Sequence, residues 1–301
     1  MLPAGRSFIW ISVNLMQRSS LPYVFLAPTM VILLALALVP TFYAIVIALQ
    51  NRELSSPDYH FVWFSNFLEL ISDKRFLNAA WVSLKWEVLT VVMTMLVATG
   101  LGILMFDLLA PRTRNVFTLL FLIPVLLPRV SAAFVWKFAF HPLYGIITYP
   151  YRAITGVPLD LLSNPTGALF TVAVVDVWQW GLFFAVIVCK LLESLPRQPI
   201  EAARIDHARP WEIHAYITLP MLKAPLISLV FVKMIESLRS FDLIYIMTRG
   251  GPGTATETLD MYAFSQGFIE AGKVSYASSM AVLMMIATSV TFTYLWKRAQ
   301  R

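Results

Sequence analysis

Six apolar segments, each long enough to cross a lipid bilayer, constrain the fold of this chain more than any other feature. A helix needs about 20 mostly apolar residues to cross about 30 Å of hydrocarbon. The segments are Tyr23–Gln50, Ala80–Leu108, Asn115–Phe140, Ala168–Leu192, Leu222–Met247 and Ala277–Trp296. A backbone in lipid must satisfy its own hydrogen bonds, which a helix does within one segment. The six segments therefore predict an all-α polytopic membrane protein with six transmembrane helices. Pro124 and Pro128 fall inside the third segment, which we expect to be kinked.

The composition agrees with a membrane protein. Of the 301 residues, 58% are hydrophobic and 13% are charged, whereas soluble domains average about 45–50% and about 25%. The net charge is +6, but the basic residues lie singly at the ends of apolar segments and form no cluster of the kind that binds nucleic acid. The single cysteine, Cys189, cannot form an internal disulfide and does not indicate a redox compartment.

The chain divides most simply into a short leading segment and one membrane domain. Arg6 followed by FIWISVNLM resembles a secretory signal, but no small-residue cleavage site follows and a longer span begins at once. We therefore interpret residues 1–22 as an uncleaved cytoplasmic or interfacial segment and residues 23–301 as the transmembrane domain. There is no internal repeat or glycine-serine linker.

The distribution of lysine and arginine predicts the orientation. With a cytoplasmic N-terminus, 11 basic residues lie on the cytoplasmic side and 6 on the other. The first set is Arg6, Arg18, Arg112, Arg114, Arg197, Arg204, Arg209, Lys223, Lys297, Arg298 and Arg301, and the second is Arg52, Lys74, Arg75, Arg152, Arg249 and Lys273. Since cytoplasmic loops carry the basic excess, we expect both termini in the cytoplasm and the chain in the cell (inner) membrane.

The loop between the fourth and fifth segments, residues 194–220, contains the charged stretch EAARIDHARPWEIHAYITLP. Pro199 suits the first turn of one helix, and Pro210 can begin a second. The pattern predicts two short helices with a turn near His207–Arg209, in the cytoplasm. Many polytopic proteins carry an amphipathic cytoplasmic helix, so the composition of the loop alone gives it no function.

Two motifs resemble those of a known family. Residues Glu201, Ala202, Ala203, Asp206, Ala208, Leu219 and Pro220 match the EAA loop of importer-type ATP-binding cassette (ABC) permeases. The stretch SFDLIYIMTRGGPGTATETL resembles a segment of the carbohydrate-uptake branch, the maltose and glycerol-phosphate type permeases. The likeness covers about residues 80–296. One position departs from it, because His207 stands where the family usually has glycine, a residue that accepts positive φ without steric cost.

The resemblance implies a type I ABC importer permease fold and a division of labour among subunits. The loop would be a coupling helix seated in a cleft of an ABC ATPase dimer, with Glu201 in a charge pair and Ala202, Ala203 and Ala208 allowing close packing. The further partners implied are a second homologous permease and an extracytoplasmic solute-binding protein. ATP and Mg would be bound by the ATPase, because this chain lacks a Gly-Lys-Ser/Thr phosphate loop. We expect no cofactor and no enzymatic activity in this chain, and transport of a sugar or sugar derivative by alternating access.

Candidate residues of the substrate pathway lie in the fourth and fifth segments. They are Trp178, Gln179, Trp180, Glu236, Arg239, Asp242 and Tyr245. Aromatic planes stack on sugar rings, amides and carboxylates bind hydroxyls, and ionisable groups in membrane spans usually face a cavity. Other interpretations stay open: tryptophans near span ends form interfacial belts.

The charges of these segments also have more than one interpretation. Lys233, Glu236, Arg239 and Asp242 alternate in sign at three-residue steps and could form a self-neutralising ladder. Arg129 and Lys137, with Arg239, would suit an anionic sugar derivative, although Arg129 could equally pair with a helix C-terminus.

Two other classes of protein are alternatives. A secondary transporter or channel needs neither the EAA-like loop nor an ATPase, and many such folds show internal repeats that are not seen here. A polytopic enzyme acting on glycans would need paired catalytic groups, for which His141, Asp160 and Glu257 are candidates by residue type alone. No histidines show metal-ligand spacing, so no metal site is expected.

Overall fold

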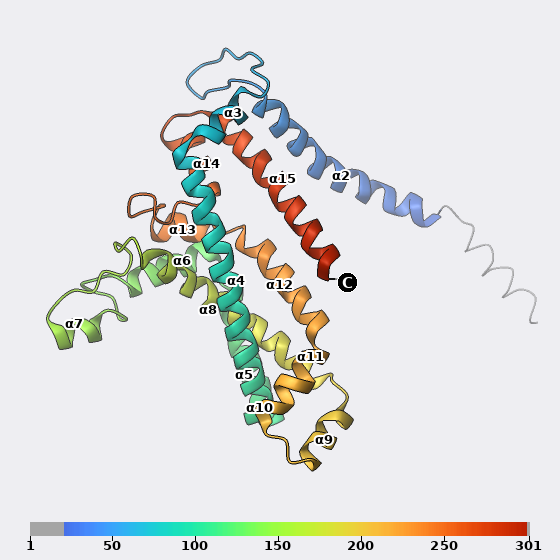
Figure 1. Ribbon diagram of the computed structural model, residues 1–301. Helices are drawn as coiled ribbons and strands as arrows, with labels where there is room; N and C mark the ends of the chain where they lie inside the picture. Colours follow the sequence, from blue (N-terminus) through green and yellow to red (C-terminus); the bar gives the residue numbers. More distant parts are fainter. Residues whose placement is uncertain (1–20, 300–301) are drawn as a thin grey trace, which may run out of the picture.

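The computed structural model describes residues 21–299, which form helices joined by loops, with no β-strand in that range (Figure 1). Residues 1–20 of the leading segment lie outside the described residues. Four helices are long and apolar enough to cross a membrane, and two bent helix pairs bring the number of spans to six if each pair is one span. The all-α, six-span prediction is confirmed in that form.

The four continuous spans are α2 (Leu21–Ala48), α4 (Lys74–Leu108), α8 (Ala168–Glu193) and α15 (Val274–Ala299). The shorter α3 (Ser65–Ser72) precedes α4, which starts six residues before the predicted Ala80. Asp73 explains that earlier start, because its side chain accepts a hydrogen bond from the Arg75 amide and caps the helix.

The third predicted span is broken rather than kinked. It consists of α5 (Pro111–Leu126) and α6 (Arg129–Ala139), whose axes differ by 96°. Pro128 has no amide hydrogen to donate and forces Leu127 into an extended conformation, with φ −74° and ψ 133°. Residues Asn115–Phe140 are therefore two helical pieces of different direction, and the expectation of one kinked helix was wrong.

The fifth predicted span is also interrupted. It contains α12 (Lys223–Ser237) and α13 (Phe241–Met247), separated by three residues. Before α12, residues Pro210–Met221 form a second bent pair with it, at 74°. The remaining short helices are α7 (Tyr149–Thr155), α9 (Arg197–Ile205), α10 (Pro210–Ile213), the π-helical η1 (His214–Thr218), α11 (Leu219–Met221), α14 (Leu259–Phe264) and the π-helical η2 (Ser265–Ile269).

The centre of the molecule is the packing of α4 against α8. Glycines let the two helices approach closely: a Cβ built on Gly102 would lie 2.8 Å from the Cβ of Val188, and one on Gly181 would lie 3.2 Å from a methyl of Val97. Small residues at such crossings are typical of membrane helices. By contrast, α2 is mostly exposed, and its main packing partner is α15 (Figure 1).

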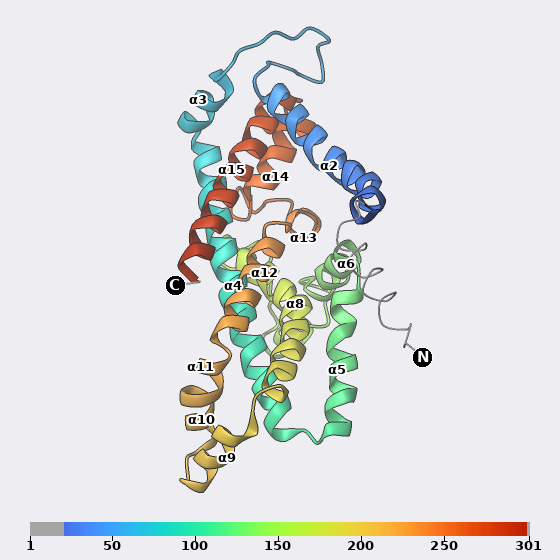
Figure 2. The same cartoon turned by 90° about the vertical axis from the view of Figure 1, so that its right-hand side faces the viewer.

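The elements divide the molecule into two ends joined by α4. Figure 2 shows α9, α10 and α11 at one end, which we call the loop end. The opposite end carries α3, the start of α15, α14 and the connection between α2 and α3. The predicted EAA-like loop is thus separated from the other end by the length of the membrane helices.

Candidate functional site

The loop between α8 and α12 folds as two short helices with a corner, as the sequence predicts. The first helix is α9 (Arg197–Ile205); the second begins as α10 (Pro210–Ile213) and continues through the π-helical η1 (His214–Thr218) and α11 (Leu219–Met221). The buried side chains of Ile200 and Ile213 anchor the two helices. The loop is therefore an ordered structure rather than a flexible connection.

The corner lies at His207, whose φ is +56°. Only a few per cent of residues other than glycine adopt this left-handed conformation, in which histidine is enriched. The amide of Ala208 donates to the carbonyl oxygen of Ala203 (3.0 Å), and the amide of Arg209 donates to Glu212 (2.7 Å). These bonds close the first helix and cap the second, so His207 keeps the backbone conformation that glycine would favour.

Most of the predicted coupling residues are exposed. Glu201, Ala202, Asp206, His207 and Pro220 are exposed, and Ala203, Ala208 and Leu219 are half-buried. A carboxylate beside small side chains, on a surface held by buried isoleucines, can pair with a cation of another protein at close approach.

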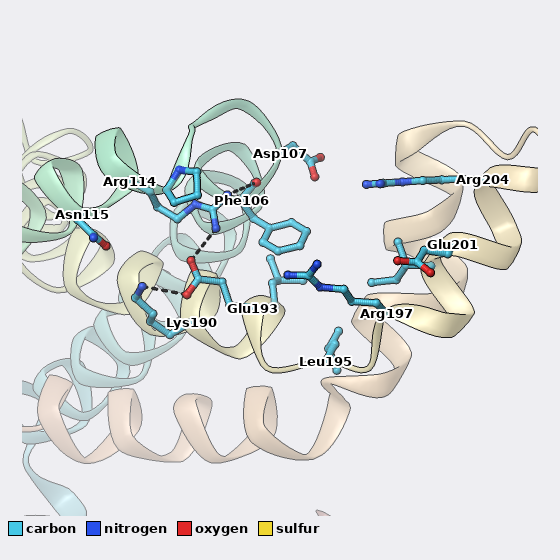
Figure 3. A pocket seen from close by; sticks show the side chains of 13 residues that line it. Phe106, Asp107, Arg114, Asn115, Lys190, Glu193, Leu195, Arg197, Glu201 and Arg204 are labelled. Carbon is cyan, nitrogen blue, oxygen red and sulfur yellow. Dashed lines mark hydrogen bonds and ion pairs between the residues drawn. The ribbon is translucent and has the colours of Figure 1, made fainter.

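Behind α9 lies a cavity of about 640 Å³ at the ends of α4, α5 and α8 (Figure 3). On one wall Arg114 binds Glu193 (2.6 Å) and donates to the carbonyl oxygens of Phe106 (2.7 Å) and Leu109 (2.9 Å), which closes the C-terminus of α4. Lys190 also binds Glu193, at 2.9 Å. On the other wall, α9 contributes the side chains of Arg197, Glu201 and Arg204.

A hydrogen-bonded histidine joins the loop to α4. Nε2 of His214 lies 2.9 Å from Oδ2 of Asp107, and Nδ1 lies 2.9 Å from the hydroxyl of Thr218. The His214 residue is 8% exposed. Sequence reasoning considered this histidine only as a metal ligand and did not consider Asp107, since the two are 107 residues apart.

A second polar centre lies between the helices where the broken spans meet. Lys233 of α12 pairs with Asp176 of α8, and both are almost completely buried, at 0% and 1% exposure. Arg129, the first residue of α6, lies 3.0 Å from the Glu236 carboxylate and 3.5 Å from that of Asp176. It also donates to the carbonyl oxygen of Arg239 (2.5 Å). Two cations and two carboxylates therefore neutralise one another across three helices.

This arrangement corrects the expectation of a charge ladder along the fifth span. Within residues 21–299, no ion pair joins Lys233, Glu236, Arg239 and Asp242 to one another. Their helix breaks after Ser237, so the three-residue spacing does not continue, while Lys233 and Glu236 pair with other helices. The alternative for Arg129 is confirmed, because its guanidinium binds the carbonyl oxygen of Arg239 just beyond the end of α12.

The predicted pathway residues surround this centre but do not form one lining. The Trp180 ring lies 5.8 Å from the Arg129 guanidinium and 5.9 Å from the Lys233 ammonium. The buried Gln179 amide donates to the carbonyl oxygens of Pro124 and Leu127, at 3.1 and 2.8 Å, and so satisfies the groups freed by the break at Pro128.

The other candidates lie at the edges of this region. Trp178 contacts Trp136 with ring centroids 5.2 Å apart, and Tyr245 stacks on Phe241 at 5.4 Å. Arg239 and Asp242 are exposed. Of the seven candidates, Glu236 is one of the four paired charges, and Trp180 lies beside two of the others, Arg129 and Lys233.

Comparison with known proteins decides which class of protein carries these features. Residues 98–300 match the family described as binding-protein-dependent transport system inner membrane component. The chain belongs to this family. The match covers two thirds of the sequence and includes both the loop and the charged centre, so the predicted class, a permease subunit of an importer, is confirmed.

Individual relatives of this permease extend the similarity to nearly the whole chain. It is 27% identical over 280 residues to the trehalose/maltose transport system permease protein MalF of Thermococcus litoralis, covering 93% of this chain and 94% of that protein. It is 30% identical over 279 residues to the sn-glycerol-3-phosphate transport system permease protein UgpA of Escherichia coli, covering 91% and 94%.

A solved structure shows the same fold. The permease is similar, with a TM-score of 0.81 and 17% identity, to a chain of a bacterial ABC transporter involved in the import of the acidic polysaccharide alginate. The similarity covers 98% of this chain and 99% of that chain. The prediction of an ABC importer permease fold is thereby confirmed.

The residues considered for catalysis have structural roles in the permease. Glu257 is buried and binds Arg75 at 2.7 Å, and Glu270 binds the same guanidinium at 2.8 Å. The hydrogen bonds from Arg75 lower the pKa of the Glu270 carboxyl below its ordinary value. This cluster ties the start of α4 to α14 and its flanking loops at the end opposite the loop.

His141 and Asp160 line a smaller cavity, of about 310 Å³. Both also stabilise turns: Nδ1 of His141 accepts from the Leu143 amide (3.2 Å), and Asp160 accepts from the Ser163 amide (3.0 Å). Glu257 does not line this cavity. Within residues 21–299, no group of three or more metal-ligating side chains comes together.

Proposed function

We propose that this permease moves a sugar or sugar derivative into the cell, driven by ATP hydrolysis in a separate ABC ATPase dimer. The observation that carries the coupling half of the proposal is the ordered loop of residues 197–221, with the Glu201 carboxylate exposed beside Ala202. In this arrangement Glu201 pairs with a cation of the ATPase, and the small side chains of α9 allow the two surfaces to approach closely.

Relatives support a carbohydrate substrate. Their names refer to trehalose and maltose, to sn-glycerol-3-phosphate and to an acidic polysaccharide, so polyhydroxylated solutes recur whether neutral or anionic. In this chain, the four charges at Arg129, Asp176, Lys233 and Glu236 neutralise one another. Trp180 offers an aromatic plane beside them for a sugar ring.

The proposed assembly contains a second, homologous permease, the ATPase dimer and an extracytoplasmic solute-binding protein. ATP and Mg bind to the ATPase and not to this chain. The loop end faces the cytoplasm with both termini, as the excess of lysine and arginine on that side favours. Closure of the ATPases pulls on the loop, and the differential affinity of the two conformations for nucleotide and binding protein biases alternating access.

The experiment is ATP hydrolysis by the complex in proteoliposomes, with its binding protein and a panel of saccharides, for the wild type and Glu201→Ala. We expect loaded binding protein to stimulate hydrolysis in the wild type, and the substitution to reduce this stimulation about tenfold, within the usual range of coupling between sites. Asp58→Ala is the matched control, because Asp58 is an exposed acid in the connection between α2 and α3, which lies at the opposite end (Figure 1).

Two results would contradict the proposal. Uptake driven by an ion gradient without ATP would identify a secondary transporter. Unchanged stimulation in an assembled Glu201→Ala complex would show that this carboxylate does not couple the loop to the ATPase. The saccharide that stimulates hydrolysis names the substrate.

A further inference from the structure

The bond between His214 and Asp107 is the polar connection between the loop and the membrane helices. Within residues 21–299, no other side-chain hydrogen bond or ion pair joins residues 196–221 to the rest of the chain. The loop is otherwise held by its two backbone connections and by apolar contacts of residues such as Ile200 and Ile213. Apolar contacts are non-directional and let one surface slide over another, whereas a hydrogen bond fixes distance and direction.

The imidazole is held at both nitrogens. Nε2 meets Asp107 and Nδ1 meets Thr218, each at 2.9 Å. Thr218 is fully buried and lies one turn further along the π-helical η1. Because the second bond orients the ring toward Asp107, the loop and α4 are joined in one geometry. π-helical turns are rare and frequently occur at functional sites.

Asp107 has a position that helix stability does not explain. It is the second-last residue of α4, and a carboxylate in the last turn of a helix is disfavoured by the helix dipole. A partner on the loop compensates for this cost. The acid is therefore better explained by its bond to the loop than by any benefit to its own helix.

Helix α4, which carries Asp107 in its last turn, is the longest helix within residues 21–299 and connects both ends of the molecule (Figure 1). Its 35 residues span about 52 Å at about 1.5 Å per residue. At its other end, Arg75 binds Glu257 and Glu270, and midway Glu87 accepts a hydrogen bond from Ser237 of α12. A displacement of Asp107 along the axis of α4 would reach all of these contacts.

We infer that His214 and Asp107 are a positioning pair that transmits movement of the loop to α4 during the transport cycle. The inference rests on the proposed function, since it requires that an ATPase moves the loop. The pair acts at a distance from the solute: it holds the second half of the loop, from α10 to α11, to the end of α4. Without it, the ATPase still binds and hydrolyses ATP, but α4 no longer follows the loop.

The test measures solute transported per ATP hydrolysed in proteoliposomes of the whole complex. His214→Phe retains an aromatic ring but removes both hydrogen bonds, and Asp107→Ala removes the acceptor. We expect each to reduce solute per ATP about tenfold, with basal ATP hydrolysis unchanged. The double variant should lose no more than either single variant, because both break the same contact.

A conservative variant separates this role from simple packing. His214→Gln places an amide donor close to the position of Nε2 and should retain most of the coupling. A second measurement uses Asp107→Cys with His214→Cys in a Cys189→Ser background. Joining the two thiols with a short bifunctional reagent should restore the solute per ATP that the unjoined pair loses.

The outcomes distinguish this inference from the proposed function. If loaded binding protein does not stimulate the wild type, the proposed function fails. If the wild type is stimulated but His214→Phe and Asp107→Ala keep its solute per ATP, or if their losses add in the double variant, the positioning role is overturned. If His214→Phe does not co-purify with its partners, the cysteine pair decides: a cross-link without restored coupling overturns the inference.

Discussion

At the scale of single residues, the most demanding environment is that of Lys233. Its ammonium lies inside the helix bundle with 0% of the side chain exposed, and its partner Asp176 is 1% exposed. Moving two charges out of water costs several kcal/mol per ion, which their attraction offsets only while both are present. Lys233→Met should therefore lower the free energy of unfolding by about 3–5 kcal/mol, as measured by detergent denaturation of the purified permease.

The matched double variant checks that explanation. Lys233→Met with Asp176→Leu removes both charges and should be within about 1 kcal/mol of the wild type or more stable, as for other buried pairs replaced by apolar residues. A double variant as unstable as Lys233→Met would mean that Arg129, which then has Glu236 as its remaining carboxylate partner, depends on Asp176.

At the scale of elements, the crossing of α4 and α8 depends on the absence of a side chain at Gly102. A Cβ there would lie 2.8 Å from Val188 and 3.0 Å from the carbonyl oxygen of Ala185, a backbone atom that cannot move aside. Gly102→Ala should destabilise the permease by about 1–3 kcal/mol, the usual cost of overpacking. Detergent denaturation measures this change.

Gly100 is the control on the same helix. Nothing lies within 4 Å of a Cβ at this position, so Gly100→Ala should stabilise α4 by roughly 0.5–1 kcal/mol through reduced backbone entropy. Equal effects of the two substitutions would show that helix propensity, and not the approach of α8, decides the stability at Gly102.

The elements also show how far the sequence predicts the structure. Apolar length located the four continuous spans and the regions of the two broken ones, and Pro199 and Pro210 located the two helices of the loop, because both signals are local. The 96° break between α5 and α6 was expected only as a kink. At the break, Gln179 of a different helix binds the carbonyl oxygens of Pro124 and Leu127, and no local pattern contains that contact.

The candidate site also has a part that the sequence predicted and a part that it did not. The EAA-like motif and the turn near His207 predicted the exposed residues of α9. The partners of Lys233, Glu236 and His214 lie 57 to 107 residues away along the chain, on other helices, and were not predicted. The three-residue spacing suggested pairs within one helix, and tertiary contacts replaced them. An acid in the last turn of α4 was the one signal that could have indicated Asp107 as a residue with a distant partner.

At the scale of the whole molecule, the two ends should face opposite sides of the membrane. The corner of the loop at His207 and the exposed connection that contains Asp58 lie at opposite ends of the structure (Figure 2). With six spans and the basic excess on the loop side, the positive-inside rule predicts that His207 lies in the cytoplasm and Asp58 outside.

Single-cysteine labelling tests this orientation. In a Cys189→Ser background, a membrane-impermeant maleimide should label the Asp58→Cys variant in intact cells, and should label His207→Cys only after permeabilisation. Both positions are exposed, so accessibility does not limit either reaction. Labelling of both from outside would contradict six crossings with α9 in the cytoplasm. Labelling of His207→Cys in intact cells, and of Asp58→Cys only after permeabilisation, would place the loop outside the cell, where no cytoplasmic ATPase could reach it. That result would contradict the proposed coupling through Glu201 and His214.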